Sequence, residues 1–247
     1  MKQIRKIILS ASMLLMFSIA AFAESGFEAI LNVPFGASIG IPPKSMKDYF
    51  GTSEAGVGFD SGVSAQLGYM IQAGDTTAVS ILAEVGYAYD TVSFRAKLKD
   101  ELGGGSFLIA SPIHSLQVGL LPKFNINGLS IGIGGGVKIP MAMSAYYKIE
   151  DNRYDSMNGK TDPVKFNMND IKNIFKPQII GYIKLTFDYS IFLSDFFAIN
   201  TGVYLGYDFM PKTALYTGMF YTNPKEETSG TFDVGVQVGL RFGPQPY

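Results

Sequence analysis

Cysteine and tryptophan are absent from this 247-residue chain, and histidine occurs once. Without cysteine there are no disulfides, no thiolate metal ligands and no cysteine for lipidation. Beyond the N-terminal segment, no uninterrupted apolar run reaches the roughly 18 residues that indicate a transmembrane helix. A basic excess is also lacking, because 20 Lys and Arg face 21 Asp and Glu. Nucleic-acid binding requires a basic patch, so we expect no nucleic-acid partner.

The first 23 residues have the pattern of a cleaved signal peptide. Lys2, Arg5 and Lys6 form its basic start, residues 7–20 are apolar, and Ala21-Phe22-Ala23 has the small residues of a cleavage site. The apolar run is shorter than the roughly 20 residues of a spanning helix, which argues against a membrane anchor. We expect one mature domain over 24–247, whose net charge falls from −1 to about −4 because three basic residues are lost.

What the chain does have is a two-residue rhythm. From Phe27 to Ile41 every odd position is apolar, while the residues between are mostly polar or small. Because successive side chains of a strand point to opposite faces, this pattern predicts a strand with one apolar face. The same rhythm predicts further strands over 57–73, 78–94, 114–126, 129–148, 178–193, 196–209 and 231–242.

Short and long connections alternate between these strands. The short ones are 74–77, 127–128 and 194–195, and the long polar ones are 42–56, 95–113, 149–177 and 210–230. This alternation predicts an eight-stranded antiparallel up-and-down transmembrane β-barrel with short periplasmic turns and four longer extracellular loops. Apolar residues at helical spacing over 168–175 predict a short helix in the third loop; an extra hairpin, giving ten strands, is the alternative.

Aromatic residues favour a membrane barrel over a soluble one. Tyr and Phe gather at both ends of the predicted strands, with Ile, Val and Leu between, as in the interfacial girdles of membrane proteins. A soluble lipocalin-like barrel would instead place its apolar face inside, around a ligand. The turn-end aromatics are Phe27, Phe124, Phe187, Tyr189, Phe197 and Phe242; the loop-end ones are Phe59, Tyr87, Tyr89, Tyr147, Tyr207 and Phe209.

If the apolar face is outward, charged residues line the lumen. We expect Glu28 to contact Arg241 on the neighbouring last strand, and Glu84 to form a mid-lumen cluster with Lys138 and Lys184. These charges either satisfy one another in a packed interior or line a selective pore. The expected lumen set is Glu28, Asp60, Glu84, Asp90, Lys123, Lys138, Lys184, Asp188, Asp208, Asp233 and Arg241.

Motifs for catalysis or cofactor binding are weak. His114 lies beside Ser111 and Ser115 at the loop end of a strand, but nothing in the sequence marks a third catalytic partner. The glycines of 132–136 lie inside an alternating strand and do not form a phosphate loop. We therefore expect no enzyme activity, no catalytic residues, no cofactor and no metal.

The last strand resembles the C-terminal signal by which barrel-assembly machinery recognises outer-membrane proteins. In Asp233-Val234-Gly235-Val236-Gln237-Val238-Gly239-Leu240 the matching positions are Gly235, Val238 and Leu240, and Phe242 resembles the terminal aromatic residue. The mature chain resembles the OmpW, OmpX and OmpA-barrel families in architecture, and also the small barrels of spirochaetes. This resemblance implies a location in the bacterial outer membrane, with outer-membrane lipid and the assembly machinery as partners.

Two functions follow as expectations. The first is a structural or surface-interaction role, in which the outer loops contact an extracellular ligand. The second is a narrow channel for small or hydrophobic solutes, which the resemblance to OmpW implies. An outer-membrane enzyme is a minor third alternative, since the sequence presents no assembled site.

Overall fold

The computed structural model describes residues 25–44, 46, 52–97, 105–150, 159–213 and 227–246. The signal peptide predicted over 1–23 lies outside these residues. Within the described part of the chain, no helix has the length and apolar character needed to cross a membrane.

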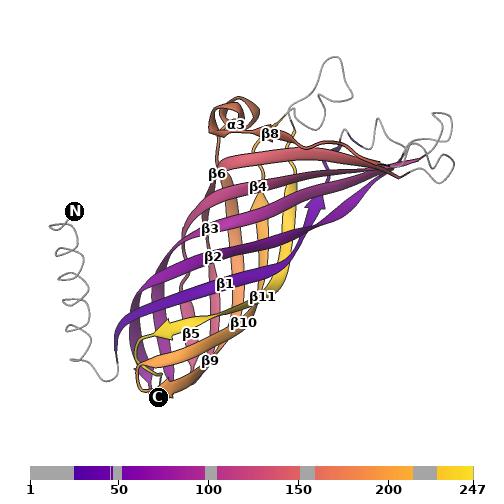
Figure 1. The fold of residues 1–247 in the computed structure, drawn as a ribbon. Helices are drawn as coiled ribbons and strands as arrows, with labels where there is room; N and C mark the ends of the chain where they lie inside the picture. Colours follow the sequence, from indigo (N-terminus) through magenta and orange to yellow (C-terminus); the bar gives the residue numbers. More distant parts are fainter. Residues whose placement is uncertain are drawn as a thin grey trace, which may run out of the picture.

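A ring of eight antiparallel strands forms the molecule (Figure 1). Each strand pairs with its neighbours in the chain, and β1 pairs with β11 from Ala29↔Phe242 to Ile41↔Gly230, which closes the ring. The predicted up-and-down barrel is therefore confirmed. The wall consists of β1 (Gly26–Ile41), β2 (Thr52–Gly74), β3 (Thr77–Lys97), β4 (Ser106–Leu120) with β5 (Lys123–Ile126), β6 (Leu129–Glu150), β9 (Ile180–Ser194), β10 (Phe197–Phe209) and β11 (Gly230–Phe242).

The three short connections are tight turns at one end of the barrel, which we call the turn end. Asn127 has φ 50°, in the left-handed region that Asn tolerates and that a two-residue hairpin requires. Pro122 separates β4 from β5 because it has no N–H to donate, yet both segments pair with β3 and β6 in a continuous register. The pair β4–β5 therefore acts as one wall strand, as predicted over 114–126.

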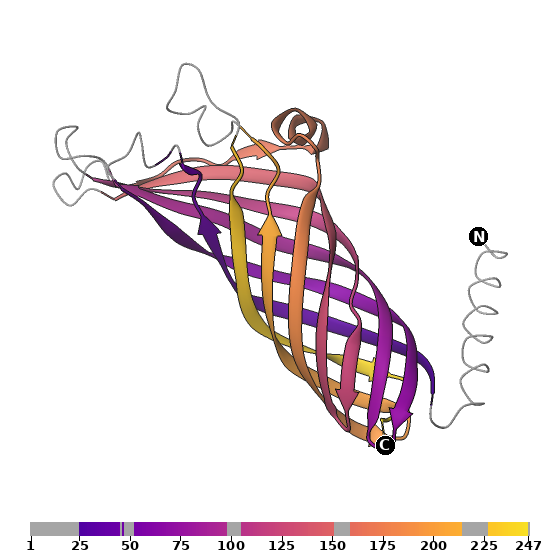
Figure 2. The same cartoon turned by 180° about the vertical axis from the view of Figure 1, so that it is seen from behind.

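The opposite end, the loop end, is asymmetric. Strands β2, β3 and β6 have 23, 21 and 22 residues, against 13 each in β10 and β11. With β4 they extend to one side beyond the rest of the barrel (Figures 1 and 2). The loops predicted over 42–56 and 95–113 are thus wrong in extent, because the ladders continue to Thr52↔Lys97 and Ser106↔Lys97. Continued pairing satisfies backbone groups that a loop would leave to water.

The third long connection contains β7 (Gly159–Lys160), β8 (Val164–Phe166) and α3 (Met168–Ile174). The predicted helix is confirmed, and Asn167 caps it by accepting hydrogen bonds from the Asn169 and Asp170 backbone amides. The alternative of ten wall strands is wrong, since β7 and β8 only add to β6 and lie off the ring.

Candidate functional site: the polar barrel interior

The barrel carries apolar side chains outside and polar side chains inside. On β11, Val234, Val236 and Val238 are 37–47% exposed, whereas Gln237 and Arg241 are at most 1% exposed. A soluble ligand-binding barrel has the reverse arrangement. An apolar surface that encircles a molecule is too large to face water, so this wall faces lipid.

Aromatic side chains mark both edges of the apolar wall. At the turn end the ring centroids of Phe197 and Phe242 are 5.1 Å apart. At the loop end Tyr207 and Phe209 stack edge to face at 4.7 Å. The first contact joins β10 to β11 and the second lies within β10, and the two stand at opposite edges of the wall, where interfacial girdles are expected.

An ion pair between the first and last strands lies nearest the turn end. Arg241 Nε lies 2.9 Å from Glu28 Oε1, and both side chains are at most 1% exposed. Ser80 donates a hydrogen bond to Glu28, and Arg241 Nη1 donates to Ser190 at 3.2 Å. The expected Glu28–Arg241 contact is confirmed, because closure makes β1 and β11 neighbours.

A second ion pair lies on the inner side of the wall and spans β6, which pairs with both β5 and β9. Lys123 Nζ lies 2.8 Å from Asp188 Oδ2, with side chains 1% and 0% exposed. Gln237 Nε2 donates to the other oxygen of Asp188. The Lys123–Asp188 pair therefore belongs to the packed interior and has no contact with bulk water.

Glu84 is the centre of a third polar layer. Lys184 Nζ lies 3.4 Å from Glu84 Oε2, and Gln66 Nε2 donates to the same oxygen at 2.9 Å. Tyr182 donates its phenolic hydrogen to Oε1 at 3.2 Å, and Gln117 also donates to this oxygen. The predicted Glu84–Lys184 contact is confirmed.

Lys138 does not join that layer, so this part of the predicted cluster is wrong. Its Nζ lies 3.0 Å from Asp90 Oδ1 and 2.7 Å from Asp208 Oδ2. In the registers, Glu84 faces Gly119, whereas Lys138 faces Gln117. Counting residues from the turns ignores the stagger between tilted strands, and this stagger moves Lys138 toward the loop end.

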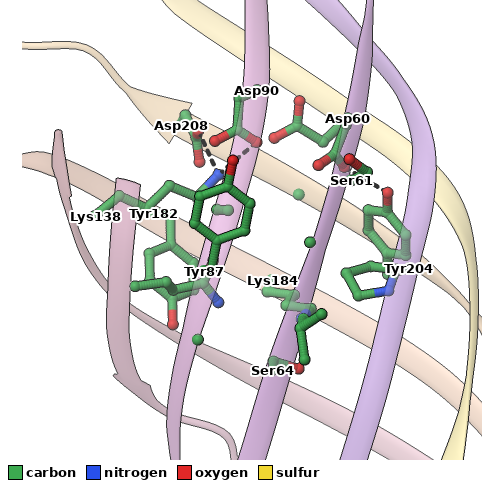
Figure 3. Close-up of a pocket in the computed structure, with 18 of the residues that line it drawn as sticks. Asp60, Ser61, Ser64, Tyr87, Asp90, Lys138, Tyr182, Lys184, Tyr204 and Asp208 are labelled. Carbon is green, nitrogen blue, oxygen red and sulfur yellow. Dashed lines mark hydrogen bonds and ion pairs between the residues drawn. The ribbon is translucent and has the colours of Figure 1, made fainter. Parts of the chain in front are cut away.

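Carboxylates outnumber cations in the layer around Lys138 (Figure 3). Asp60 and Asp233 join Asp90 and Asp208 there, and all four residues are at most 6% exposed. The phenolic hydroxyl of Tyr204 donates to Asp60 Oδ2. One carboxylate oxygen from each of Asp60, Asp90 and Asp233 lies within 4.8 Å of the others.

An internal cavity is lined by residues of both the Lys138 layer and the Glu84 layer. Its water-accessible volume is about 40 Å³, and Tyr87, Tyr182, Lys184 and Tyr204 contribute to its lining (Figure 3). This volume holds about three water molecules. The cavity can therefore hydrate charged groups but is too small for an organic solute.

Apolar side chains form a buried cluster on the loop side of these charges. Ile171 of α3 and Phe175 directly after it are at most 1% exposed and pack against inward residues of the wall. We call this group the apolar plug. The plug consists of Met46, Val92, Phe94, Ala96, Ile109, Ile113, Met143, Ile171, Phe175, Ile180 and Met210.

His114 belongs to the loop-end aromatic girdle. Its Nδ1 forms a 2.6 Å hydrogen bond with the Tyr87 hydroxyl, and its ring meets Tyr89 edge to face at 5.0 Å. Ser111 and Ser115 are completely buried on the opposite, inward face of β4. The structure therefore does not bring His114 together with the neighbouring serines.

The contacts of several uncharged interior residues with the lumen carboxylates were not predicted from the sequence. Gln66, Gln117, Tyr182 and Tyr204 all contact lumen carboxylates. The alternation of inward and outward positions could have identified them, because each occupies an inward position of its strand. Gly235 makes room for Tyr204, since an added Cβ would come within 2.6 Å of its hydroxyl oxygen.

The other residues of the proposed assembly signal face outward. Val238, Leu240 and Phe242 are 47%, 39% and 41% exposed on the lipid-facing wall. Their recognition by assembly machinery stays a prediction.

No protein-family model matches the chain, and no curated protein matches it. Solved structures similar to it include Neisserial surface protein A (12% identity, 87% of this chain and 97% of that chain, TM-score 0.33). Others are the outer membrane protease OmpT from Escherichia coli (8%, 88% and 96%, TM-score 0.37) and OprG from Pseudomonas aeruginosa (15%, 89% and 97%, TM-score 0.32). These identities and TM-scores are too low to carry an argument. The placement of the chain in a membrane therefore rests on its own apolar wall.

Proposed function

We propose that this chain is an integral protein of the bacterial outer membrane that acts in surface interaction or in outer-membrane structure, without enzymatic activity. Its lipid-facing wall, polar lumen and N-terminal export pattern support the location, because closed barrels are the β-structures that cross a membrane. The loops and the asymmetric extension of β2, β3, β4 and β6 would then present the extracellular surface, where a ligand would bind.

The filled lumen is the observation that carries this proposal. Ion pairs, polar side chains and the apolar plug occupy the interior, and the cavity among them measures about 40 Å³. Eight strands enclose about enough space for side chains to fill. A barrel filled in this way supports a surface or structural role better than solute passage.

Single-channel conductance in a planar bilayer tests the proposal. We expect no current steps from the refolded wild type or from Lys138→Ala/Lys184→Ala, with folding confirmed by a heat-dependent gel shift. An added porin controls for bilayer quality. Discrete steps from the wild type, with a size or ion selectivity that the double variant changes, would contradict the plugged lumen.

A second candidate is a narrow channel for hydrophobic solutes. An apolar pocket of about 250 Å³ lies at the wall and shares Ile183, Lys184 and Gly206 with the lining of the internal cavity. A solute would pass between the two at Lys184. Binding of a fluorescent apolar probe that Leu205→Trp abolishes and exposed-loop Asp162→Asn leaves intact would favour this function.

A further inference from the structure

The acidic layer around Lys138 has an unbalanced charge. Four buried aspartates, Asp60, Asp90, Asp208 and Asp233, share the layer with Lys138. If all were ionised, their formal charge would be −4 + 1 = −3. Buried charges require partners, because removing an ion from water costs several kcal/mol. Lys138 forms ion pairs with Asp90 and Asp208 and not with Asp60 or Asp233.

We infer that Asp60, Asp90 and Asp233 bind a calcium ion inside the barrel. Their three carboxylate oxygens lie within 4.8 Å of one another. Oxygens about 2.3–2.6 Å from Ca²⁺ can lie up to about 5 Å apart, so this spacing fits one coordination sphere. A divalent cation would bring the layer to −3 + 2 = −1.

Unpaired oxygen atoms provide a second, independent observation. Asp233 Oδ1 has no hydrogen-bond partner, and water does not replace one, because the residue is only 4% exposed. Thr231 Oγ1 is also buried without a partner, in a residue that is 0% exposed and pairs with Asp208 in the β10–β11 register. A buried acceptor without a donor costs about 1–3 kcal/mol, and a cation bound by the carboxylate of Asp233 would supply a partner for its Oδ1.

The chemistry of the layer favours calcium over magnesium. Magnesium needs near-ideal octahedral geometry at about 2.0–2.1 Å and retains several waters, whereas calcium accepts irregular sets of oxygens. The ligands come from β2, β3 and β11, which are held by the barrel ladders and cannot move together easily. The adjacent cavity can supply the water ligands that complete the calcium sphere.

The three ligands lie far apart in the sequence, which explains why no linear motif revealed this site. Asp60 and Asp90 face each other across the β2–β3 register, and Asp233 reaches them from the last strand after closure (Figure 3 labels the first two). A bound ion would link the start and the end of the barrel wall. Calcium would therefore stabilise the closed ring.

Terbium luminescence tests the site directly, since Tb³⁺ replaces Ca²⁺ and tyrosines transfer energy to it. Tyr204, hydrogen-bonded to Asp60, is a suitable donor. The protein is refolded with Tb³⁺ present, because the layer is buried. We expect saturable emission that Ca²⁺ reverses, at least ten-fold weaker binding in Asp233→Asn, and unchanged binding in the exposed control Asp162→Asn.

Asp60→Asn provides a second variant if Asp233→Asn does not fold, and a gel shift reports folding. Ca²⁺ is also expected to raise the temperature of the heat-dependent gel shift for the wild type and not for the variants. Absence of saturable emission from the folded wild type, or equal affinity in a folded Asp233→Asn or Asp60→Asn protein, would overturn the inference.

Discussion

The buried Lys123–Asp188 pair allows a quantitative test of the filled lumen. At 2.8 Å, and with an effective dielectric constant of about 20, the attraction between the charges is about 6 kcal/mol. Desolvation offsets much of it, so the measurable quantity is the cost of leaving one charge alone. Removing one partner of a buried pair typically costs about 3–5 kcal/mol. Asp188 would keep its hydrogen bond from Gln237, so we expect Lys123→Met to lower the free energy of unfolding by about 3 kcal/mol.

A double variant distinguishes the free-energy cost of an unpaired buried charge from the cost of losing the ion pair itself. Lys123→Met/Asp188→Asn removes both charges and retains an acceptor for Gln237, so its free energy of unfolding should lie within about 1 kcal/mol of wild type. Urea unfolding in detergent micelles, followed by far-UV circular dichroism, measures both values; tryptophan fluorescence is not available, since the chain has no Trp. A single variant as stable as wild type would show that water solvates Asp188 and would refute the filled lumen.

Three further predictions concern the wall, the plug and the extension. Val236→Arg places a charge on the lipid-facing wall, so the same urea assay should show a loss of about 2–4 kcal/mol. Phe175→Ala removes a ring that is 1% exposed, so amide hydrogen exchange of α3 should become faster by an amount equivalent to about 3–5 kcal/mol; unchanged exchange would contradict the plug. A side-chain hydrogen bond from Lys97 lowers the pKa of Glu54, which lies on the extension beyond the loop-end girdle. Lys97→Met should return this pKa toward its ordinary value, as measured by carboxyl-carbon NMR against pH; a pKa that stays low would refute this cause.

The sequence predicted the barrel because its signal repeats along every wall strand. Apolar residues such as Val234 and Val236 must face lipid, and residues such as Gln237 must face the interior, so each strand shows the pattern separately. Strand ends were less predictable. The residues from Thr52 to Gly56 look polar and loop-like, yet β3 continues to pair with β2 up to Lys97.

Contacts inside the lumen were predictable in part, because counting residues from the turns found the Glu84–Lys184 pair and misplaced Lys138, whereas closure decided the Glu28–Arg241 pair. Glu28 and Arg241 lie near the turn end on the first and last strands, so the order of strands was enough to pair them. The partners of Lys138 depend on the stagger of β6 against β3 and β10, which the sequence does not contain. Because the stagger is not in the sequence, the four aspartates of the acidic layer could be assigned to the lumen, but their proximity to one another could not be predicted.

The interior charges have a further consequence for how the barrel selects one register. The lipid-facing side chains are nearly interchangeable, so a shift of two residues between strands would still leave an apolar wall outside. Inside, the same shift would move Lys123 away from Asp188 and Arg241 away from Glu28, leaving buried charges alone at about 3–5 kcal/mol each. The apolar wall therefore specifies insertion into a membrane, whereas the inward charges specify which residues of neighbouring strands meet.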